Sequence, residues 1–199
     1  MHLLLFAGFL GSGKTTLVIP LSKAVVQSGY RVAIIVNEIG EIGIDNQLMR
    51  QLDLNVWELV AGCICCTLSG DLVTTLQNVD SDYVPDLVIV EASGAANPQS
   101  VLRALPYYRG RSLTSVRIVS VVDPLRLAML MEVLTPLVTS QIQHADVIVI
   151  TKTDLAKPEE VEFAHRTSRE LNLNARIVST GVRGHLEPTL ISELLPWLN

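Results

Sequence analysis

The chain has 199 residues, a net charge of −5 at pH 7 and 49% hydrophobic residues. This length suits one domain with a full core, and the acidic balance argues against a nucleic-acid partner. No apolar run reaches the ~20 residues that a membrane-spanning helix needs. The apolar start has no basic residues before it, which is unlike a secretion signal, so we expect a cytoplasmic protein with no membrane partner.

Short apolar runs rich in β-branched residues alternate with longer segments of helical period. This alternation is typical of a parallel sheet covered by helices on both faces. In chain order we predict a strand at Leu3–Ala7, a helix at Lys14–Gln27, strands at Arg31–Val36 and Asn55–Leu59, a helix at Ser69–Val79, a strand at Leu87–Val90, a helix at Pro98–Leu105, a strand at Val116–Val122, helices at Pro124–Glu132 and Pro136–Gln143, a strand at Val147–Ile150, a helix at Pro158–Leu171, a strand at Arg176–Val178 and a helix at Pro188–Leu195. The pattern predicts an α/β fold of three layers with a mostly parallel central sheet. Ligands of such sheets bind beyond the carboxyl ends of the strands.

The first predicted strand runs into Gly-Phe-Leu-Gly-Ser-Gly-Lys-Thr at residues 8–15, which fits the phosphate-loop pattern of nucleotide-binding proteins. Its glycines would let backbone N–H groups point at phosphate oxygens. Lys14 would reach the β- and γ-phosphates, and the Thr15 hydroxyl would bind Mg²⁺. The predicted nucleotide contacts in this loop are Gly8, Gly11, Ser12, Gly13, Lys14, Thr15 and Thr16. The motif predicts a phosphate-loop NTPase fold.

An acidic residue and a glycine follow the strand predicted at Leu87–Val90. In phosphate-loop proteins an acidic residue at this position holds Mg²⁺, often through water, so we assign Glu91 to the Mg²⁺ site with Thr15. Gly94 can offer its N–H to the γ-phosphate. By itself Glu91 could be a carboxylate at a helix N-terminus, but the phosphate loop favours the functional interpretation.

Thr-Lys-Thr-Asp at residues 151–154 follows another predicted strand and resembles the Asn-Lys-x-Asp motif with which GTPases bind their base. Asp154 would accept hydrogen bonds from N1–H and the 2-amino group of guanine, while the stem of Lys152 packs on the base. Adenine lacks these donors, and an unpaired buried carboxylate costs about 1–3 kcal/mol or more. Ser179 could close over the guanine carbonyl from the other side. We therefore predict GTP, with an ATPase or a small-molecule kinase as the competing hypothesis.

Two further features are candidates for a role near the nucleotide, the loop at residues 37–45 and Asp123. Residues 37–45 mix glycines with carboxylates, which suits a loop that changes shape near the γ-phosphate. Within this loop Glu41 could bind a metal ion or help to position the attacking water, and the sequence leaves both roles open. Asp123, before Pro124, is expected to cap a helix, with a role near the nucleotide as the alternative.

All three cysteines, Cys63, Cys65 and Cys66, lie within four positions. A disulfide framework would spread its cysteines along the chain, so this cluster indicates metal or redox chemistry. The thiols can supply two or three ligands to Zn²⁺ or a similar ion, and Glu41, water or a second subunit could complete the set. The alternative is that they are small core residues in a tight turn.

Together these motifs resemble the CobW-type metallochaperone GTPases, relatives of the urease, hydrogenase and methylmalonyl-CoA mutase accessory GTPases. The resemblance rests on residues 8–17, 37–45, 62–68 and 151–154, and on Glu91, Gly94 and Pro98. Its most specific element is Cys-x-Cys-Cys. It spans nearly the whole chain but only the GTPase domain of the family, so we expect a single GTPase domain over residues 1–199, without the C-terminal CobW-type domain.

The resemblance implies slow GTP hydrolysis, for which we assign Lys14, Glu41 and Glu91 as catalytic residues. It also implies that the Cys-x-Cys-Cys element binds a transition metal, Zn²⁺ or Co²⁺, and delivers it to a client metalloprotein or a cobalamin-related pathway. A homodimer that depends on nucleotide or metal could accompany this activity. The alternative is a GTP-gated switch for a corrinoid-dependent enzyme, in which the cysteines are structural.

Overall fold

The computed structural model describes residues 1–36, 55–58, 68–181 and 186–198. Seven strands form one sheet in the order β3-β2-β4-β1-β5-β6-β7, and every neighbouring pair is parallel. The strands are β1 (His2–Ala7), β2 (Val32–Val36), β3 (Asn55–Glu58), β4 (Leu87–Glu91), β5 (Ser115–Val122), β6 (Val147–Ile150) and β7 (Arg176–Ser179). The predicted α/β fold is confirmed, and the carboxyl ends of all seven strands lie at one edge of the sheet.

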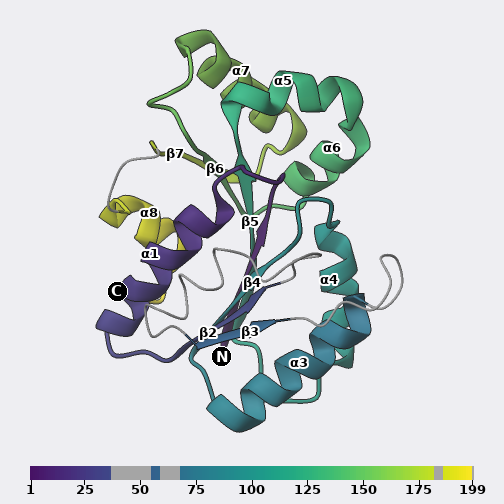
Figure 1. Cartoon of the computed structure of the whole chain (residues 1–199), viewed down its shortest axis with the longest axis vertical. Helices are drawn as coiled ribbons and strands as arrows, with labels where there is room; N and C mark the ends of the chain where they lie inside the picture. Colours follow the sequence, from purple (N-terminus) through teal and green to yellow (C-terminus); the bar gives the residue numbers. More distant parts are fainter. Residues whose placement is uncertain (37–54, 59–67, 182–185, 199) are drawn as a thin grey trace.

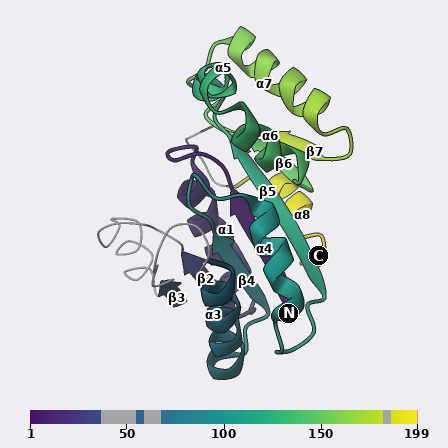
Figure 2. The ribbon, with the colours of Figure 1, turned by 90° about the vertical axis from the view of Figure 1, so that its right-hand side faces the viewer.

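The helices cover both faces of this sheet (Figure 1). They are α1 (Lys14–Gln27), α3 (Leu68–Tyr83), α4 (Pro98–Ala104), α5 (Pro124–Val133), α6 (Thr135–Gln143), α7 (Pro158–Leu171) and α8 (Pro188–Leu194), with a 3₁₀ turn at Leu105–Tyr107. Among the described helices, α1 and α8 lie on one face, and α3 and α4 lie on the other (Figures 1 and 2). No helix in the described ranges is long and apolar enough to cross a membrane.

Alternating side chains of each strand pack into two separate layers of the core. In β1, for example, Leu3 and Leu5 join the layer beneath α3, whereas Leu4 and Phe6 join the layer beneath α1. All four side chains are at most 2% exposed. Because both faces are buried, the central strands β1, β2 and β4 and also β6 are almost entirely apolar rather than alternately polar, as is typical of parallel sheets.

Polar side chains cap the N-termini of two helices, α4 and α5, at the carboxyl edge of the sheet. Asn97 accepts a hydrogen bond from the backbone N of Gln99 at the start of α4 (2.9 Å), and Asp123 does the same for Leu125 at the start of α5 (3.0 Å). In both cases Pro follows the cap, where its missing N–H costs no helical hydrogen bond. The predicted capping role of Asp123 is confirmed.

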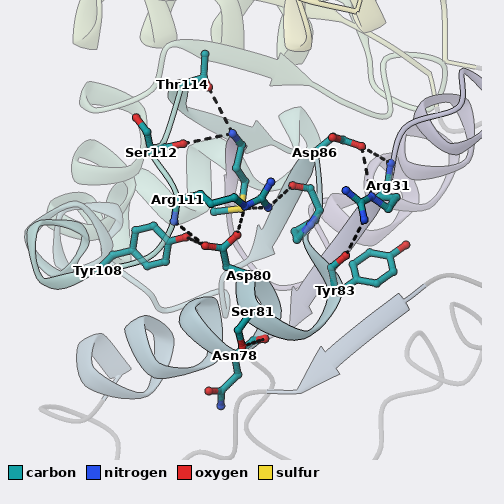
Figure 3. Close-up of polar contacts among 12 residues, drawn as sticks. Arg31, Asn78, Asp80, Ser81, Tyr83, Asp86, Tyr108, Arg111, Ser112 and Thr114 are labelled. Atoms are coloured by element: carbon teal, nitrogen blue, oxygen red, sulfur yellow. Dashed lines mark hydrogen bonds and ion pairs between the residues drawn. The ribbon is translucent and has the colours of Figure 1, made fainter.

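A polar cluster at the opposite edge ties the end of α3 to the loop before β5 (Figure 3). The Asp80 carboxylate accepts hydrogen bonds from the Tyr108 hydroxyl (2.5 Å), the Arg111 backbone N (2.7 Å) and Arg111 Nε (2.5 Å). Burial raises the pKa of Asp80, but the hydrogen bonds from Tyr108 and Arg111 outweigh it, so the pKa lies below its usual value. Burial, together with the hydrogen bond to the same carboxylate and its charge, raises the pKa of Tyr108 far above its usual value.

We expect Asp80→Asn to destabilise the fold by about 2 kcal/mol at pH 7, because hydrogen bonds to charged groups contribute roughly 1.5–3 kcal/mol each and Asn keeps some of them. The pKa of Asp80 is lower in the folded protein than in the unfolded chain. The charged carboxylate therefore contributes its full stabilisation above the unfolded pKa, and this stabilisation is lost as the pH falls through the folded pKa. Urea unfolding from pH 7 to pH 3 should therefore show the parent and the variant converging. The exposed neighbour Asp82→Asn should leave stability nearly unchanged at every pH; a constant difference between parent and Asp80→Asn down to pH 3 would contradict the assignment.

Candidate nucleotide-binding site

The phosphate loop connects β1 to α1 at the carboxyl edge of the sheet, and its conformation requires glycine. Gly8 has φ 143°, and a Cβ on it would lie 2.4 Å from the carbonyl oxygen of Val121 on β5. Any side chain at this position would therefore collide with backbone and not with a movable side chain. The loop packs directly on β5, which fixes its place above the sheet.

Lys14, the first residue of α1, folds back over this loop. Its side chain is buried, and Nζ donates to the carbonyl oxygens of Gly8 (3.0 Å) and Phe9 (3.3 Å). A buried ammonium needs acceptors, and the loop carbonyls supply them here. An incoming phosphate offers stronger, charged acceptors to the same group.

The two residues predicted to hold Mg²⁺ lie in contact. The Thr15 hydroxyl donates to Glu91 Oε1 at 2.8 Å, and Glu91, the last residue of β4, is 7% exposed. Hydroxyl and carboxylate oxygens are the donors that Mg²⁺ prefers, so this pair fits the ion. Thr16, next along α1, is exposed.

The loop after β4 lies against the phosphate loop at Gly94. A Cβ on Gly94 would be 2.5 Å from the backbone N of Leu10, so only glycine permits this approach. The structure thus brings Gly94 to the tip of the loop that was predicted to hold the phosphates.

The base-binding motif follows β6 and is tied to the phosphate loop by two side chains. Thr151 donates from Oγ1 to the Ser12 carbonyl at 2.7 Å. Lys152 has φ 55°, and its Nζ donates to the Gly11 carbonyl at 2.6 Å and to Asp123 Oδ2 at 2.7 Å. The side chain of Asp123 is 3% exposed, so loss of Lys152 would leave a buried carboxylate without its cation.

Asp154 and the residues after β7 form the outer part of the same edge. Asp154 is exposed, and a Cβ on Gly181 would be 3.0 Å from its Cγ. The backbone N of Thr153 donates to the Thr180 carbonyl at 3.2 Å, which holds the two loops side by side. Ser179, predicted to approach the base, is exposed and pairs through Oγ with His165 Nε2 at 2.8 Å.

Three residues in this edge were missed or undervalued by the sequence reasoning. Asp123 pairs with Lys152 in addition to capping α5. Arg126 donates from Nη1 to the Leu10 carbonyl at 2.8 Å, and Gly181 lies beside Asp154. The signal for the first two was their place just after β5, at the edge where ligands of parallel sheets bind.

The predicted transition-metal ligands, Cys63, Cys65, Cys66 and Glu41, lie outside the described residues. Within the described ranges, no group of three or more His, Cys, Asp or Glu side chains could hold a metal ion. The segment with the cysteines is flanked by β3, which ends at Glu58, and α3, which begins at Leu68. Because β3 is a parallel strand of the sheet, Glu58 stands at the carboxyl edge.

Comparisons with known proteins show the family of this chain. Residues 2–179 match the family described as "CobW/HypB/UreG, nucleotide-binding domain". The chain is 32% identical over 183 residues to the zinc chaperone YjiA of Escherichia coli, which covers 87% of this chain and 55% of that protein. It is 30% identical over 202 residues to the zinc-regulated GTPase metalloprotein activator 1 of Schizosaccharomyces pombe, covering 96% of this chain and 47% of that protein.

A solved structure gives the same fold. The hydrogenase maturation factor HypB of Archaeoglobus fulgidus aligns with a TM-score of 0.72 at 18% identity, covering 100% of this chain and 91% of the other. The chain spans about half the length of the curated relatives it matches (55% and 47%). Since the family match extends from the first strand to the last one and includes every nucleotide motif, the chain belongs to the CobW/HypB/UreG nucleotide-binding family of phosphate-loop GTPases.

Proposed function

We propose that this chain binds GTP, hydrolyses it slowly to GDP and phosphate, and carries a transition metal for delivery to a client protein. The observation that carries the nucleotide part is the meeting of three motifs at one edge: the phosphate loop, Glu91 and the loop of Lys152. Their hydrogen bonds join residues that are far apart in the sequence. The metal part is supported by the three neighbouring thiols and by relatives that are named zinc chaperones.

Each residue has a stated part in this proposal. Lys14 exchanges its loop carbonyls for oxygens of the β- and γ-phosphates. Asp154 accepts hydrogen bonds from the guanine edge, with Ser179 on the other side of the base. Thr15 and Glu91 would hold Mg²⁺, which neutralises phosphate charge when it is bound. Gly94 donates its N–H to the γ-phosphate.

The cysteine segment is proposed as the cargo site, with zinc or cobalt as the ion. Thiolates suit these metals, and the segment leaves the sheet from Glu58 at the nucleotide edge. Glu41 either adds a ligand or positions the attacking water. We further propose that residues 1–199 act as one GTPase domain in the cytoplasm, and that the client is a metalloprotein or a corrinoid enzyme, met by the chain alone or as a homodimer.

Anaerobic Zn²⁺ titration, with and without a non-hydrolysable GTP analogue, tests both halves together. We expect Cys65→Ser to weaken Zn²⁺ binding about 100-fold or more, because changes next to metal ligands alone cost about 10–100-fold. The analogue should change the affinity of the parent for Zn²⁺ by about 5-fold or more, the usual size of coupling between two sites.

Ile64→Val, which keeps all three thiols, is the matched control and should bind Zn²⁺ like the parent. Unchanged Zn²⁺ affinity in Cys65→Ser would refute the proposal that the cysteine segment is the cargo site. If client binding then still depended on nucleotide, the alternative of a GTP-gated switch with structural cysteines would stand in its place.

A further inference from the structure

One buried side chain of α6 reaches the loop that lies against the phosphate loop. Gln141 is 3% exposed, and its Nε2 donates to the carbonyl oxygens of Gly94 and Ala96, both at 3.2 Å. An amide nitrogen carries two hydrogens, so one side chain can hold both carbonyls at once. The planar peptide unit that contains the Gly94 carbonyl begins at the Gly94 Cα, so these hydrogen bonds also restrain the residue whose N–H is assigned to the γ-phosphate.

The neighbouring residue on α6 holds the end of the same loop. The Ser140 hydroxyl donates to Asn97 Oδ1 at 2.9 Å, and that oxygen also accepts the backbone N of Gln99 at the start of α4. Two consecutive residues of α6 therefore form hydrogen bonds with both ends of residues 94–97. Residues 94–96 are Gly-Ala-Ala and carry no polar side chain that could hold this part of the loop.

A small cavity separates α6 from the phosphate loop. Gln141, Leu10 and Ser12 line a cavity of about 20 Å³, which opens between them and has room for about one water molecule. The buried Ser12 hydroxyl has no hydrogen-bond partner within the described residues. The hydrogen bonds from Gln141 therefore link α6 directly to the part of the loop that lies nearest the phosphate loop, Gly94 and Ala96.

We infer that Gln141 is a positioning residue, which holds residues 94–97 where they meet the γ-phosphate of bound GTP. The inference rests on the proposed function, in which Gly94 contacts that phosphate. GDP lacks the γ-phosphate, so the effect of Gln141 falls on the triphosphate state and on hydrolysis. A residue that served stability alone would affect both nucleotides equally.

The test compares Gln141→Met with Gln143→Met in the full chain. Met keeps the length of the side chain without its hydrogen bonds, and Gln143 is an exposed residue of the same helix. Calorimetric titration measures the Kd of GDP and of a non-hydrolysable GTP analogue for each protein, and single-turnover assays measure GTP hydrolysis. We expect Gln141→Met to raise the Kd of the GTP analogue about tenfold, which corresponds to about 1.4 kcal/mol, and to slow GTP hydrolysis. The Kd of GDP should change less than twofold. Gln143→Met should bind both nucleotides and hydrolyse GTP like the parent.

Equal losses of affinity for GDP and for the GTP analogue in Gln141→Met, or no loss for either, would refute the positioning role of Gln141. If Gln141→Met does not fold, Ser140→Ala replaces it in the test, since it removes the second contact to the loop. It should also weaken binding of the GTP analogue more than binding of GDP, by a smaller factor. A parent chain that binds neither guanine nucleotide would refute the proposed function and this inference with it. A parent that binds both, with no split in the variants, refutes the inference alone.

Discussion

GTP hydrolysis is expected to fall about 10²–10³-fold in Lys14→Ala, the usual cost of removing one charge-stabilising donor from a transition state. The Nζ of Lys14 is held by two carbonyls at 3.0 and 3.3 Å, so it is already directed into the loop that would surround the phosphates. Triphosphate affinity should fall as well, since the charge that opposes the β- and γ-phosphates is gone. Single-turnover hydrolysis of radiolabelled GTP measures both effects.

The control is Lys23→Ala, which removes the same charge from the same helix away from the loop. It should hydrolyse GTP like the parent. Thermal unfolding separates a lost phosphate contact from a damaged fold: we expect both variants to melt within a few degrees of the parent. Full hydrolysis by folded Lys14→Ala would show that the loop does not bind the phosphates as assigned.

The strand and helix pattern was predictable because burial on both sheet faces leaves a strong signal. The strands β1, β2, β4 and β6 are nearly continuous apolar runs, and Pro or Asn-Pro marks the start of several helices. The clearest difference is α3, which was predicted to end at Val79 and continues to Tyr83. Its last turn carries Asp80, whose partners Tyr108 and Arg111 lie about 30 residues further on, and no local pattern reveals such a pair.

The site was predictable in its residue types and less so in its contacts. Thr15 and Glu91 were assigned together from their motifs, and their side chains meet at 2.8 Å. The bond between Lys152 and Asp123 depends on two facts that the sequence does not display: β5 and β6 are neighbours in the sheet, and Lys152 adopts a positive φ. Short-range patterns report secondary structure, whereas such pairs follow from the order of the strands.

Gln141 illustrates the same limit for a buried polar residue. In the sequence it stands on a predicted helix between Ser140 and Ile142 and belongs to no motif. Only the packing of α6 beside the Gly94 loop gives its amide two acceptors. A buried polar side chain that is satisfied by the backbone of a functional loop is invisible until the loop and the helix are placed together.

Base specificity is the second place where a large effect is expected. Guanine presents two donors, N1–H and the 2-amino group, and Asp154 is assigned as the acceptor of both. Asn at this position keeps one acceptor but replaces the other with a donor. We expect Asp154→Asn to weaken GDP binding about 100-fold or more, because two hydrogen bonds to a charged group contribute roughly 1.5–3 kcal/mol each.

The same change should improve binding of xanthosine diphosphate, whose base carries a carbonyl in place of the 2-amino group. The Asn amide can donate to that carbonyl while its oxygen accepts N1–H, so the pairing that guanine loses is restored for xanthine. Displacement of a fluorescent nucleotide measures the affinities for GDP and for xanthosine diphosphate. Glu159→Gln, which removes an exposed carboxylate on α7, is the control for lost charge. A loss of GDP binding without a gain for xanthosine diphosphate would mean that Asp154 acts through its charge and not through the base edge. Equal displacement of bound GDP by ATP and GTP from the parent would show that this edge of the sheet does not select guanine at all.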